Sequence, residues 1–289
     1  MHDVPGEHEA ELEEAPEVAE EILSYYEQGK EDGRLSNTPE GKLEFARTKD
    51  LLLRFLPKPP AVVYDVGGGP GMYATWLAAL GYEVHLLDPV PLHLQQAMEA
   101  SEKQPDHPIS EFLLQDAREI MLGGETADAV LLMGPLYHLP NPNDRRWALS
   151  ESLRVLKSRG VLLAVGISRF ASVLDGLKRK LVDDPEYVEI MTNDLATGEH
   201  LNTSTTGQDY FTTSYLHPPT EFRRELANAG FQNTELYAIE GPAWMLSELG
   251  HYMDGKEKTE ALLALIKSIE SETSLIGASA HILAVGRKA

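Results

Sequence analysis

The sequence predicts an α/β protein whose core is a doubly wound parallel sheet. Short β-branched runs alternate with helical patterns from residue 61 to residue 165, an order that produces a parallel sheet with helices on both faces. The first run ends in a cluster of glycines, and several later runs end in an acidic or glycine-containing turn. Folds of this class bind ligands at the carboxyl ends of the strands, so these turns are the expected site.

The alternation also gives the order of the expected elements. Gly81 ends the helix that follows the glycine cluster, and Pro91 suits the first turn of the next helix, because a helix start leaves its N–H groups unpaired. A C-terminal part of the core follows Thr220, which can cap a helix. We expect strands at 61–65, 83–87, 111–114, 129–133, 161–165, 235–239 and 280–285, and helices at 72–80, 91–100, 144–157, 220–229, 243–251 and 257–272.

The segments outside this alternation divide the chain further. The first residues are acidic and are predicted to form a disordered tail, and two amphipathic helices separated by a polar break follow. These helices either close over the ligand site as a lid or cover a face of the sheet. We expect an acidic tail at 1–17, a helical lid at 18–56, a core at 57–167, an inserted cap that binds substrate at 168–219 and the remainder of the core at 220–289.

Composition excludes several classes of function. The formal net charge is −21, and nine acidic residues among the first 21 leave −12 for the rest of the chain. Repulsion of this kind disfavours unaided binding to nucleic acid or to an anionic membrane, so a small-molecule substrate is the expected partner. The lack of cysteine excludes thiolate chemistry, the ten histidines show no metal-binding spacing, and no apolar run could span a bilayer. We expect a cytoplasmic protein without a metal, and the oligomeric state stays open.

The glycine cluster carries the most specific motif. Asp65 ends the first expected strand, and Gly67, Gly69 and Gly71 follow in the pattern Asp-x-Gly-x-Gly-x-Gly before a helix. Glycines allow positive φ and a close approach of a ligand to the backbone. The pattern resembles motif I of the class I S-adenosylmethionine (SAM) methyltransferases, particularly the small-molecule group that includes the ubiquinone and menaquinone methyltransferases. The resemblance implies SAM as cofactor and a Rossmann-like seven-stranded sheet with an antiparallel last strand.

The same resemblance implies roles for two acids and the loop. The motif I glycines would face the methionine portion and the ribose of SAM, and Asp65 would accept a hydrogen bond from water or from the ammonium group. Asp88, 23 residues beyond Asp65, would accept both ribose hydroxyls, because a carboxylate offers two acceptor oxygens. An acid at a strand end can instead cap a helix or a turn. Three acids at successive strand ends beside the glycine loop favour a binding site.

Further cofactor contacts are implied at later turns. Asp116 and the Ala117 backbone would meet the adenine, and the carbonyl of Gly134 would hold the ammonium group. Arg47, on the second N-terminal helix, would reach the SAM carboxylate if that helix folds over the loop.

A dinucleotide-binding pattern overlaps the same loop. Residues 69–74 also fit G-x-G-x-x-A, and Asp88 lies near the position of a ribose-binding acid, so a NAD-dependent oxidoreductase is an alternative function. The start of the glycine run at Gly67 and the position of Asp116 favour methyl transfer. A catalytically silent SAM-binding regulatory protein is a second alternative.

The fourth expected strand ends in Gly134-Pro135-Leu136-Tyr137-His138-Leu139, which corresponds to motif IV, beside the methyl group in the family. His138 is the candidate general base, since an imidazole changes protonation near neutral pH. Its alternative role is structural, through a hydrogen bond to nearby backbone. Tyr137 is a second catalytic candidate that could simply pack.

The substrate pocket is expected where the chain departs from the shared core. The lid offers two tyrosines, and the inserted cap offers aromatic residues and an arginine that could pair with a substrate anion or with a surface acid. These candidates are Tyr25, Tyr26, Arg169, Tyr210, Phe211, Tyr215 and His217.

Overall fold

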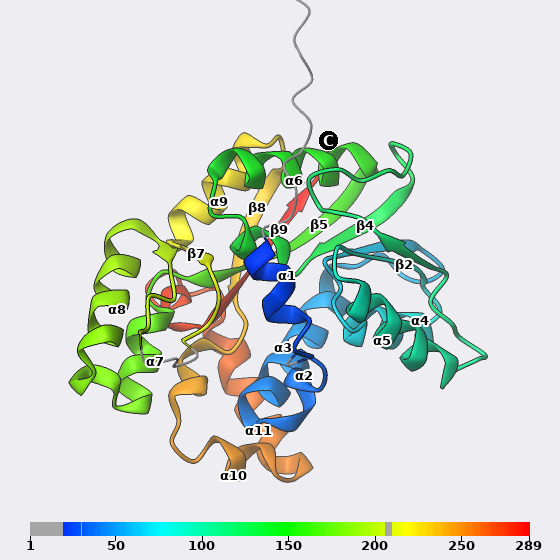
Figure 1. The fold of residues 1–289 in the computed structure, drawn as a ribbon. Coiled ribbons are helices and arrows are strands. Elements are labelled where there is room, and N and C mark those ends of the chain that lie inside the picture. The colour runs from blue at the N-terminus through cyan, green and yellow to red at the C-terminus, as the bar shows by residue number, and fades with distance from the viewer. Residues whose placement is uncertain (1–19, 30, 206–209) are drawn as a thin grey trace, which may run out of the picture.

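The computed structural model describes residues 20–29, 31–205 and 210–289, so the predicted tail at 1–17 lies outside the described residues. A central sheet runs through the molecule (Figure 1). Its parallel part has the order β3–β2–β1–β4–β5, in which the first strand of the chain lies in the middle. These strands are β1 (Val62–Val66), β2 (Glu83–Asp88), β3 (Glu111–Leu114), β4 (Ala127–Leu132) and β5 (Leu156–Ser168).

Two C-terminal strands complete the core sheet. The last strand, β9 (His281–Arg287), lies antiparallel between β5 and β8 (Gln232–Ala238). The doubly wound sheet with an antiparallel last strand is therefore confirmed, and these seven strands belong to a sheet of nine.

The inserted segment adds two short strands that the sequence did not predict. They are β6 (Glu199–His200) and β7 (Ser214–His217). Strand β7 pairs in parallel with the last residues of β5, beyond the point where β4 ends, and it contacts the turn that follows β4. All four residues of β7 are buried, so tertiary burial overrides the polar character of the surrounding sequence.

Helices cover both faces of the sheet, and each face has its own hydrophobic core. Successive residues of β1 point to opposite faces of the sheet, as the two-residue period of a strand requires. Val63 therefore packs in one core and Tyr64 in the other. Figure 1 shows α6 and α9 on one side and α3, α4 and α5 on the other. Their bounds are α3 (Pro39–Phe55), α4 (Met72–Ala79), α5 (Pro91–Glu102), α6 (Pro142–Val155) and α9 (Pro219–Asn228).

The remaining helices surround this core. The insertion contributes α7 (Ala171–Arg179) and α8 (Pro185–Thr197), which lie together at one end of the sheet (Figure 1). Where one helix was expected at 243–251, the chain forms a 3₁₀ turn, Gly241–Met245, and a separate α10 (Leu249–Met253), followed by α11 (Lys256–Ile269). Among the described helices, none has both the length and the apolar character to cross a bilayer.

Two short helices precede α3. They are α1 (Glu20–Tyr26) and α2 (Arg34–Asn37), and α2 is a single turn within the expected polar break. Thr38 then caps α3 by accepting a hydrogen bond from the Gly41 N–H at 3.0 Å. Figure 1 shows α1 in front of the carboxyl edge of the sheet, near β7.

Candidate active site

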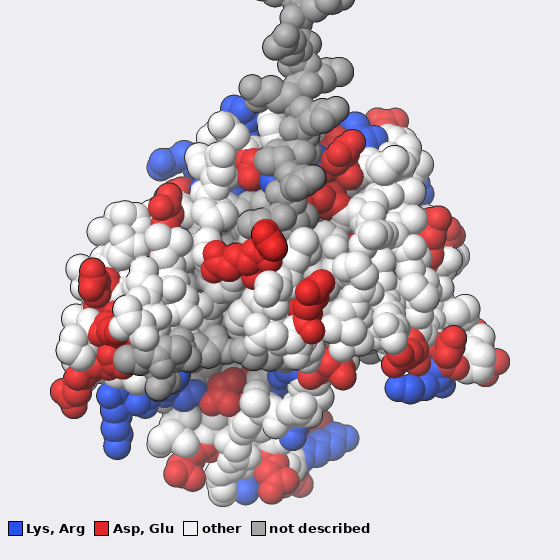
Figure 2. All heavy atoms as spheres, viewed as in Figure 1, with Lys and Arg blue, Asp and Glu red and all other residues white. Residues whose placement is uncertain are grey.

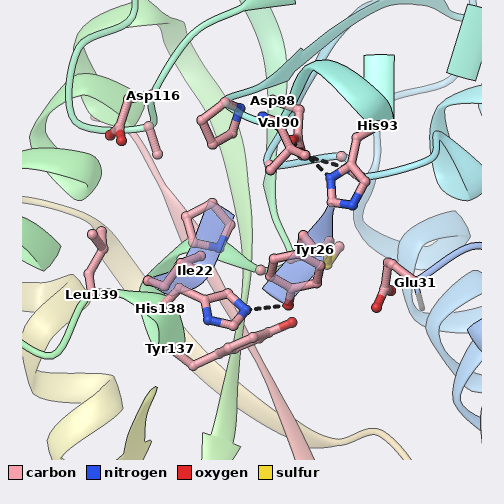
Figure 3. Close-up of a pocket in the computed structure, with 18 of the residues that line it drawn as sticks. Ile22, Tyr26, Glu31, Asp88, Val90, His93, Asp116, Tyr137, His138 and Leu139 are labelled. Carbon is pink, nitrogen blue, oxygen red and sulfur yellow. Dashed lines mark hydrogen bonds and ion pairs between the residues drawn. The ribbon is translucent and has the colours of Figure 1, made fainter. Parts of the chain in front are cut away.

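A cavity of about 300 Å³ lies at the carboxyl ends of the parallel strands. Its walls come from the glycine loop after β1, from the turns after β2 and β3 and from the Met133–Pro140 segment after β4. The N-terminal segment supplies another wall, through Ile22 and Tyr26 of α1 (Figure 3) and through Arg34 of α2. The cavity is therefore built by the core and the N-terminal helices together.

The glycine loop owes its shape to two positions where a side chain has no room. At Gly67, with φ +69°, an added Cβ would lie 2.5 Å from Pro135 Cγ. At Gly71, with φ +81°, it would lie 2.9 Å from the Cβ of Ala97 in α5, and Gly71 does not line the cavity. Gly69 lines the cavity, and its nearest neighbour would be 3.8 Å away. Gly67 and Gly71 thus allow close packing, whereas Gly69 leaves space for a ligand.

Asp65 lines the cavity, and no side chain pairs with it. It is fully buried, and neither carboxylate oxygen has a partner within hydrogen-bond distance among the described residues, although the nearby Ala74 backbone favours its ionised form. Burial and the nearby charge of Asp88 raise the pKa of Asp65 to about 7. An unpaired buried carboxylate at this place fits a cationic ligand group that donates hydrogen bonds.

Asp88 is held in a fixed orientation at the end of β2. Its Oδ2 accepts a hydrogen bond from the Gly69 N–H at 2.8 Å, and its Oδ1 accepts from the Val90 N–H at 2.9 Å. His93 Nδ1 lies 3.0 Å from Oδ1 (Figure 3). These contacts fix a carboxylate at the cavity wall with acceptor capacity left for a ligand.

Asp116 and Ala117 also line the cavity, but Asp116 is already paired. The guanidinium of Arg118 donates from Nε to Oδ1 and from Nη2 to Oδ2 of Asp116, both at 2.9 Å. Its Nη1 contacts Asp144 at 3.1 Å. Sequence reasoning missed Arg118, although an arginine two residues beyond a strand-end acid is the signal for such a bidentate pair.

The turn after β4 and α1 meet across the cavity. A 3₁₀ turn, η1 (Pro135–His138), presents Tyr137 and His138. The hydroxyl of Tyr26 lies 2.6 Å from His138 Nε2, and Figure 3 shows the two side chains facing each other. Burial lowers the pKa of His138 to about 4, so the imidazole is neutral at physiological pH. Burial also raises the pKa of Tyr26 well above its usual value, so the phenol keeps its proton.

The structure does not bring Arg47 to the cavity. Its side chain is 1% exposed, and it donates to the Ile239 carbonyl at 3.0 Å and to the carboxylate of Glu270. Its helix packs on the sheet and points this residue away from the loop. Arg34 lines the cavity instead, where it pairs with Glu31 at 2.7 Å and with Glu44 at 2.6 Å.

Most of the predicted substrate residues lie outside the cavity wall. Tyr26 lines it, and among the described residues of the insertion only Thr213 does so. The Phe211 ring lies 6.0 Å from the rings of both Tyr25 and His138, so Tyr25 and Phe211 pack behind the wall.

The other four candidates in the insertion make contacts within it or with α9. Arg169 donates to the Leu216 carbonyl at 2.8 Å. The remaining three pair with carboxylates, Tyr210 with Asp184, Tyr215 with Glu221 and His217 with Glu225. Aromatic residues in this segment therefore do not indicate the pocket by themselves.

Three potential metal ligands, Glu44, Glu240 and His281, lie close together beside α3. Arg34 already occupies both oxygens of Glu44, at 2.6 Å and 3.0 Å. Burial opposes protonation of His281, but Glu44 and Glu240 outweigh it and raise the pKa of His281 to about 9. The cluster is an ion-pair network in which the protonated imidazole takes the place of a cation.

The fold and the site define a class of protein. A doubly wound sheet with an antiparallel last strand, a glycine loop after its central strand and carboxylates at the next strand ends make up the Rossmann-like fold of a methyltransferase domain. Residues 64–164 match the family model described as "Methyltransferase domain". No curated protein matches the chain in sequence.

Solved structures share the fold across most of the chain. A SAM-dependent methyltransferase from Methanosarcina mazei is 17% identical, with a TM-score of 0.57 over 82% of this chain and 96% of that one. A protein from Pyrococcus horikoshii is 16% identical, with a TM-score of 0.59 over 92% and 99%. A possible histamine N-methyltransferase from Thermotoga maritima is 16% identical, with a TM-score of 0.53 over 93% and 98%. At these identities the likeness shows the fold.

Proposed function

We propose that this protein transfers the methyl group of SAM to a small-molecule acceptor by in-line displacement. The observation that carries the proposal is a single cavity lined by two chemically different sets of residues. Asp65 and Asp88 lie beside the glycine loop, and Tyr26 and His138 form a neutral phenol–imidazole pair in the same cavity. Methyl transfer needs such a site, where an acceptor is aligned with an electrophilic methyl and water is excluded.

We propose that the carboxylates beside the glycine loop hold the cofactor. Bound SAM supplies an electrophilic sulfonium methyl group. Asp88 would accept hydrogen bonds from the ribose hydroxyls, and Asp65 and the Gly134 carbonyl would accept from the ammonium group. Asp116 and Ala117 border the adenine, where the Arg118 pairing fixes the position of Asp116.

We further propose that the N-terminal helices act as a lid and that the acceptor is small. Tyr26 of α1 and Arg34 of α2 line the cavity, so an acceptor of large size would have to displace them. Figure 2 shows acidic side chains over the middle of the face that carries α1, with Lys and Arg mostly at its margins, a distribution unfavourable for polyanions. Kinship with the ubiquinone and menaquinone methyltransferases, and a cytoplasmic location, remain predictions.

An acceptor screen tests this function. The protein is incubated with SAM and pooled small metabolites, and S-adenosylhomocysteine formation is measured together with the mass gain of one methyl group in an acceptor. We expect acceptor-dependent product formation that Asp88→Ala abolishes. Tight SAM binding without methylation of any acceptor would support the catalytically silent alternative instead.

A further inference from the structure

The contact between Tyr26 and His138 joins two parts of the chain that are 112 residues apart. Tyr26 ends the short helix α1, and His138 ends η1 after β4. The Tyr26 ring lies edge-on to His138, with ring centroids 5.3 Å apart, and edge-on to His93 at 5.2 Å. Figure 3 shows Tyr137 beside the same pair. The tertiary structure thus places a phenol and an imidazole in direct hydrogen-bond contact at the cavity wall.

Most carboxylates that line the cavity are already engaged by donors. Their oxygens accept hydrogen bonds from cationic, N–H or hydroxyl groups of the protein. Asp65 is fully buried beside Gly68 of the glycine loop, where the proposed contact with the SAM ammonium group would engage it. The engaged carboxylates are Asp88 with the Gly69 and Val90 N–H groups, Asp116 and Asp144 with Arg118, Glu31 with Arg34, and Glu21 with the Thr213 hydroxyl.

Both partners of this hydrogen bond are neutral. Burial lowers the pKa of His138 to about 4, and burial raises that of Tyr26. A neutral imidazole carries one N–H and one bare nitrogen, so the tautomer of His138 sets the direction of the bond. Only the tautomer with its proton on Nδ1 lets the phenol O–H donate to Nε2, and Nδ1 is buried without a partner within hydrogen-bond distance among the described residues.

This inference rests on the proposed methyl transfer. We propose that Tyr26 and His138 form a proton relay for an acceptor that carries a neutral hydroxyl group, so that the chain is an O-methyltransferase. As the acceptor oxygen bonds to the methyl carbon, the carbon–sulfur bond breaks and its electron pair stays on sulfur. The hydroxyl proton passes to Tyr26 Oη, and the proton of Tyr26 passes to His138 Nε2. The products are a methyl ether, S-adenosylhomocysteine and an imidazolium.

The acidity of the acceptor selects a hydroxyl over an amine. A hydroxyl has a free lone pair before it loses its proton, and the oxonium that forms during attack is far more acidic than an imidazolium, so even a weak base assists. An alkylammonium, with a pKa of about 10, has no lone pair, and neutral His138 is too weak a base to create one. A neutral amine gives a product ammonium that does not protonate His138.

The charge of the site also permits the relay. A buried imidazolium is costly unless another positive charge disappears nearby. The sulfonium becomes a neutral thioether in the step that protonates His138, so the net charge of the cavity is unchanged. Asp88 lies close enough to favour the protonated imidazole electrostatically.

Nuclear magnetic resonance of the imidazole nitrogens tests the pair without any acceptor. Protein labelled with ¹⁵N is observed at neutral pH, alone and with S-adenosylhomocysteine, and His138→Gln identifies the His138 signals. We expect the Nδ1–H form with a hydrogen-bonded Nε2, and a change at Nε2 in Tyr26→Phe. Tyr252→Phe, which alters an exposed tyrosine of α10, is the matched control and should change nothing at His138. An Nε2–H form in the unaltered protein, or an unchanged Nε2 in Tyr26→Phe, overturns the relay.

Turnover then tests the acceptor class. Matched acceptors that differ only in one group, such as phenol and aniline or benzyl alcohol and benzylamine, extend the metabolite screen. We expect methylation at oxygen and a loss of about 100-fold in kcat in Tyr26→Phe, in the range of general base catalysis, with unchanged SAM affinity. Methylation of amines alone, or equal kcat in Tyr26→Phe, overturns the relay while methyl transfer stands. Failure of the unaltered protein to bind SAM would overturn the proposed function itself.

Discussion

The Oδ2 atom of Asp88 accepts a hydrogen bond from the backbone N–H of Gly69 at 2.8 Å. This bond ties the end of β2 to the glycine loop that follows β1. The carboxylate proposed to hold the ribose therefore also fixes the loop that faces the rest of the cofactor. Binding and loop geometry are coupled through one side chain.

Replacement of Asp88 and of His138 should separate cofactor binding from turnover. Asp88→Ala removes charged hydrogen bonds of about 1.5–3 kcal/mol each, so SAM affinity should fall at least 10-fold in calorimetry. His138→Ala should keep SAM affinity within about threefold and lower turnover, because a general base contributes to the chemical step. Glu102→Ala, an exposed change in α5, is the control. Equal losses of SAM affinity in both variants refute this division of roles.

Gly67 should tolerate no side chain because of packing as well as backbone conformation. In Gly67→Ala the new Cβ meets Pro135 at 2.5 Å, which shifts the loop against η1. Gly29 has nearly the same φ, +70°, but an added Cβ there has no neighbour within 4 Å. Gly29→Ala thus controls for backbone strain. We expect a larger drop in Tm and a loss of SAM binding in Gly67→Ala alone, and matching effects in both variants would contradict the clash.

Asp65 should make the cofactor-free protein less stable as the pH rises. Burial raises its pKa from 3.8 to about 7, so the folded state holds a proton that the unfolded state has released. The contribution of Asp65 to stability is therefore lost progressively between about pH 4 and about pH 7. Asp65→Asn should remove this slope, giving a higher Tm at pH 8 but weaker SAM binding. Parallel Tm profiles of variant and parent across this range would contradict a perturbed Asp65.

His281 should contribute stability that disappears in alkaline solution. Burial opposes its protonation, but Glu44 and Glu240 raise its pKa from 6.5 to about 9. The stabilisation is complete below about pH 6.5 and is lost as the pH rises through about 9. Chemical denaturation between pH 6 and pH 10 measures this loss, and His281→Gln should flatten it. If His281→Gln lost as much stability between pH 6 and pH 10 as the unaltered protein, the ion-pair network would be contradicted.

Arg47 should matter for stability and not for the cofactor. Its replacement by leucine leaves the buried carboxylate of Glu270 with Arg54 alone, and breaking a buried pair costs about 3–5 kcal/mol. Urea denaturation should show this loss, while SAM affinity, measured at a temperature where the variant is folded, should be unchanged. A loss of SAM affinity with unchanged stability would contradict this role and would indicate that Arg47 contacts the cofactor.

The parallel core could be predicted from sequence because its signals are local. The strand that ends at Asp65, the glycine loop and the strand that ends at Asp88 each follow from a few adjacent residues. The helix cap predicted at Thr220 was wrong, because α9 begins at Pro219 and Pro218 is its N-cap residue. The parallel direction of the strands followed because parallel strands need crossover connections, which the intervening helices supply.

Contacts between distant residues could not be predicted in this way. Nothing local to Tyr26 indicates His138, and nothing local to Arg47 indicates Glu270, which lies 223 residues later. In the insertion, Tyr215 resembled a pocket residue by type, but its hydroxyl donates to Glu221 in the first turn of α9. The type of a residue indicated which interactions its side chain could make. Which partner the side chain meets depended on tertiary packing.

The most direct test of the account is a calorimetric titration of the protein with SAM and, separately, with NAD. The glycine loop, Asp65 and Asp88 predict saturable binding of one SAM per chain and no heat of binding with NAD. Binding of NAD without binding of SAM would contradict the assignment of the site.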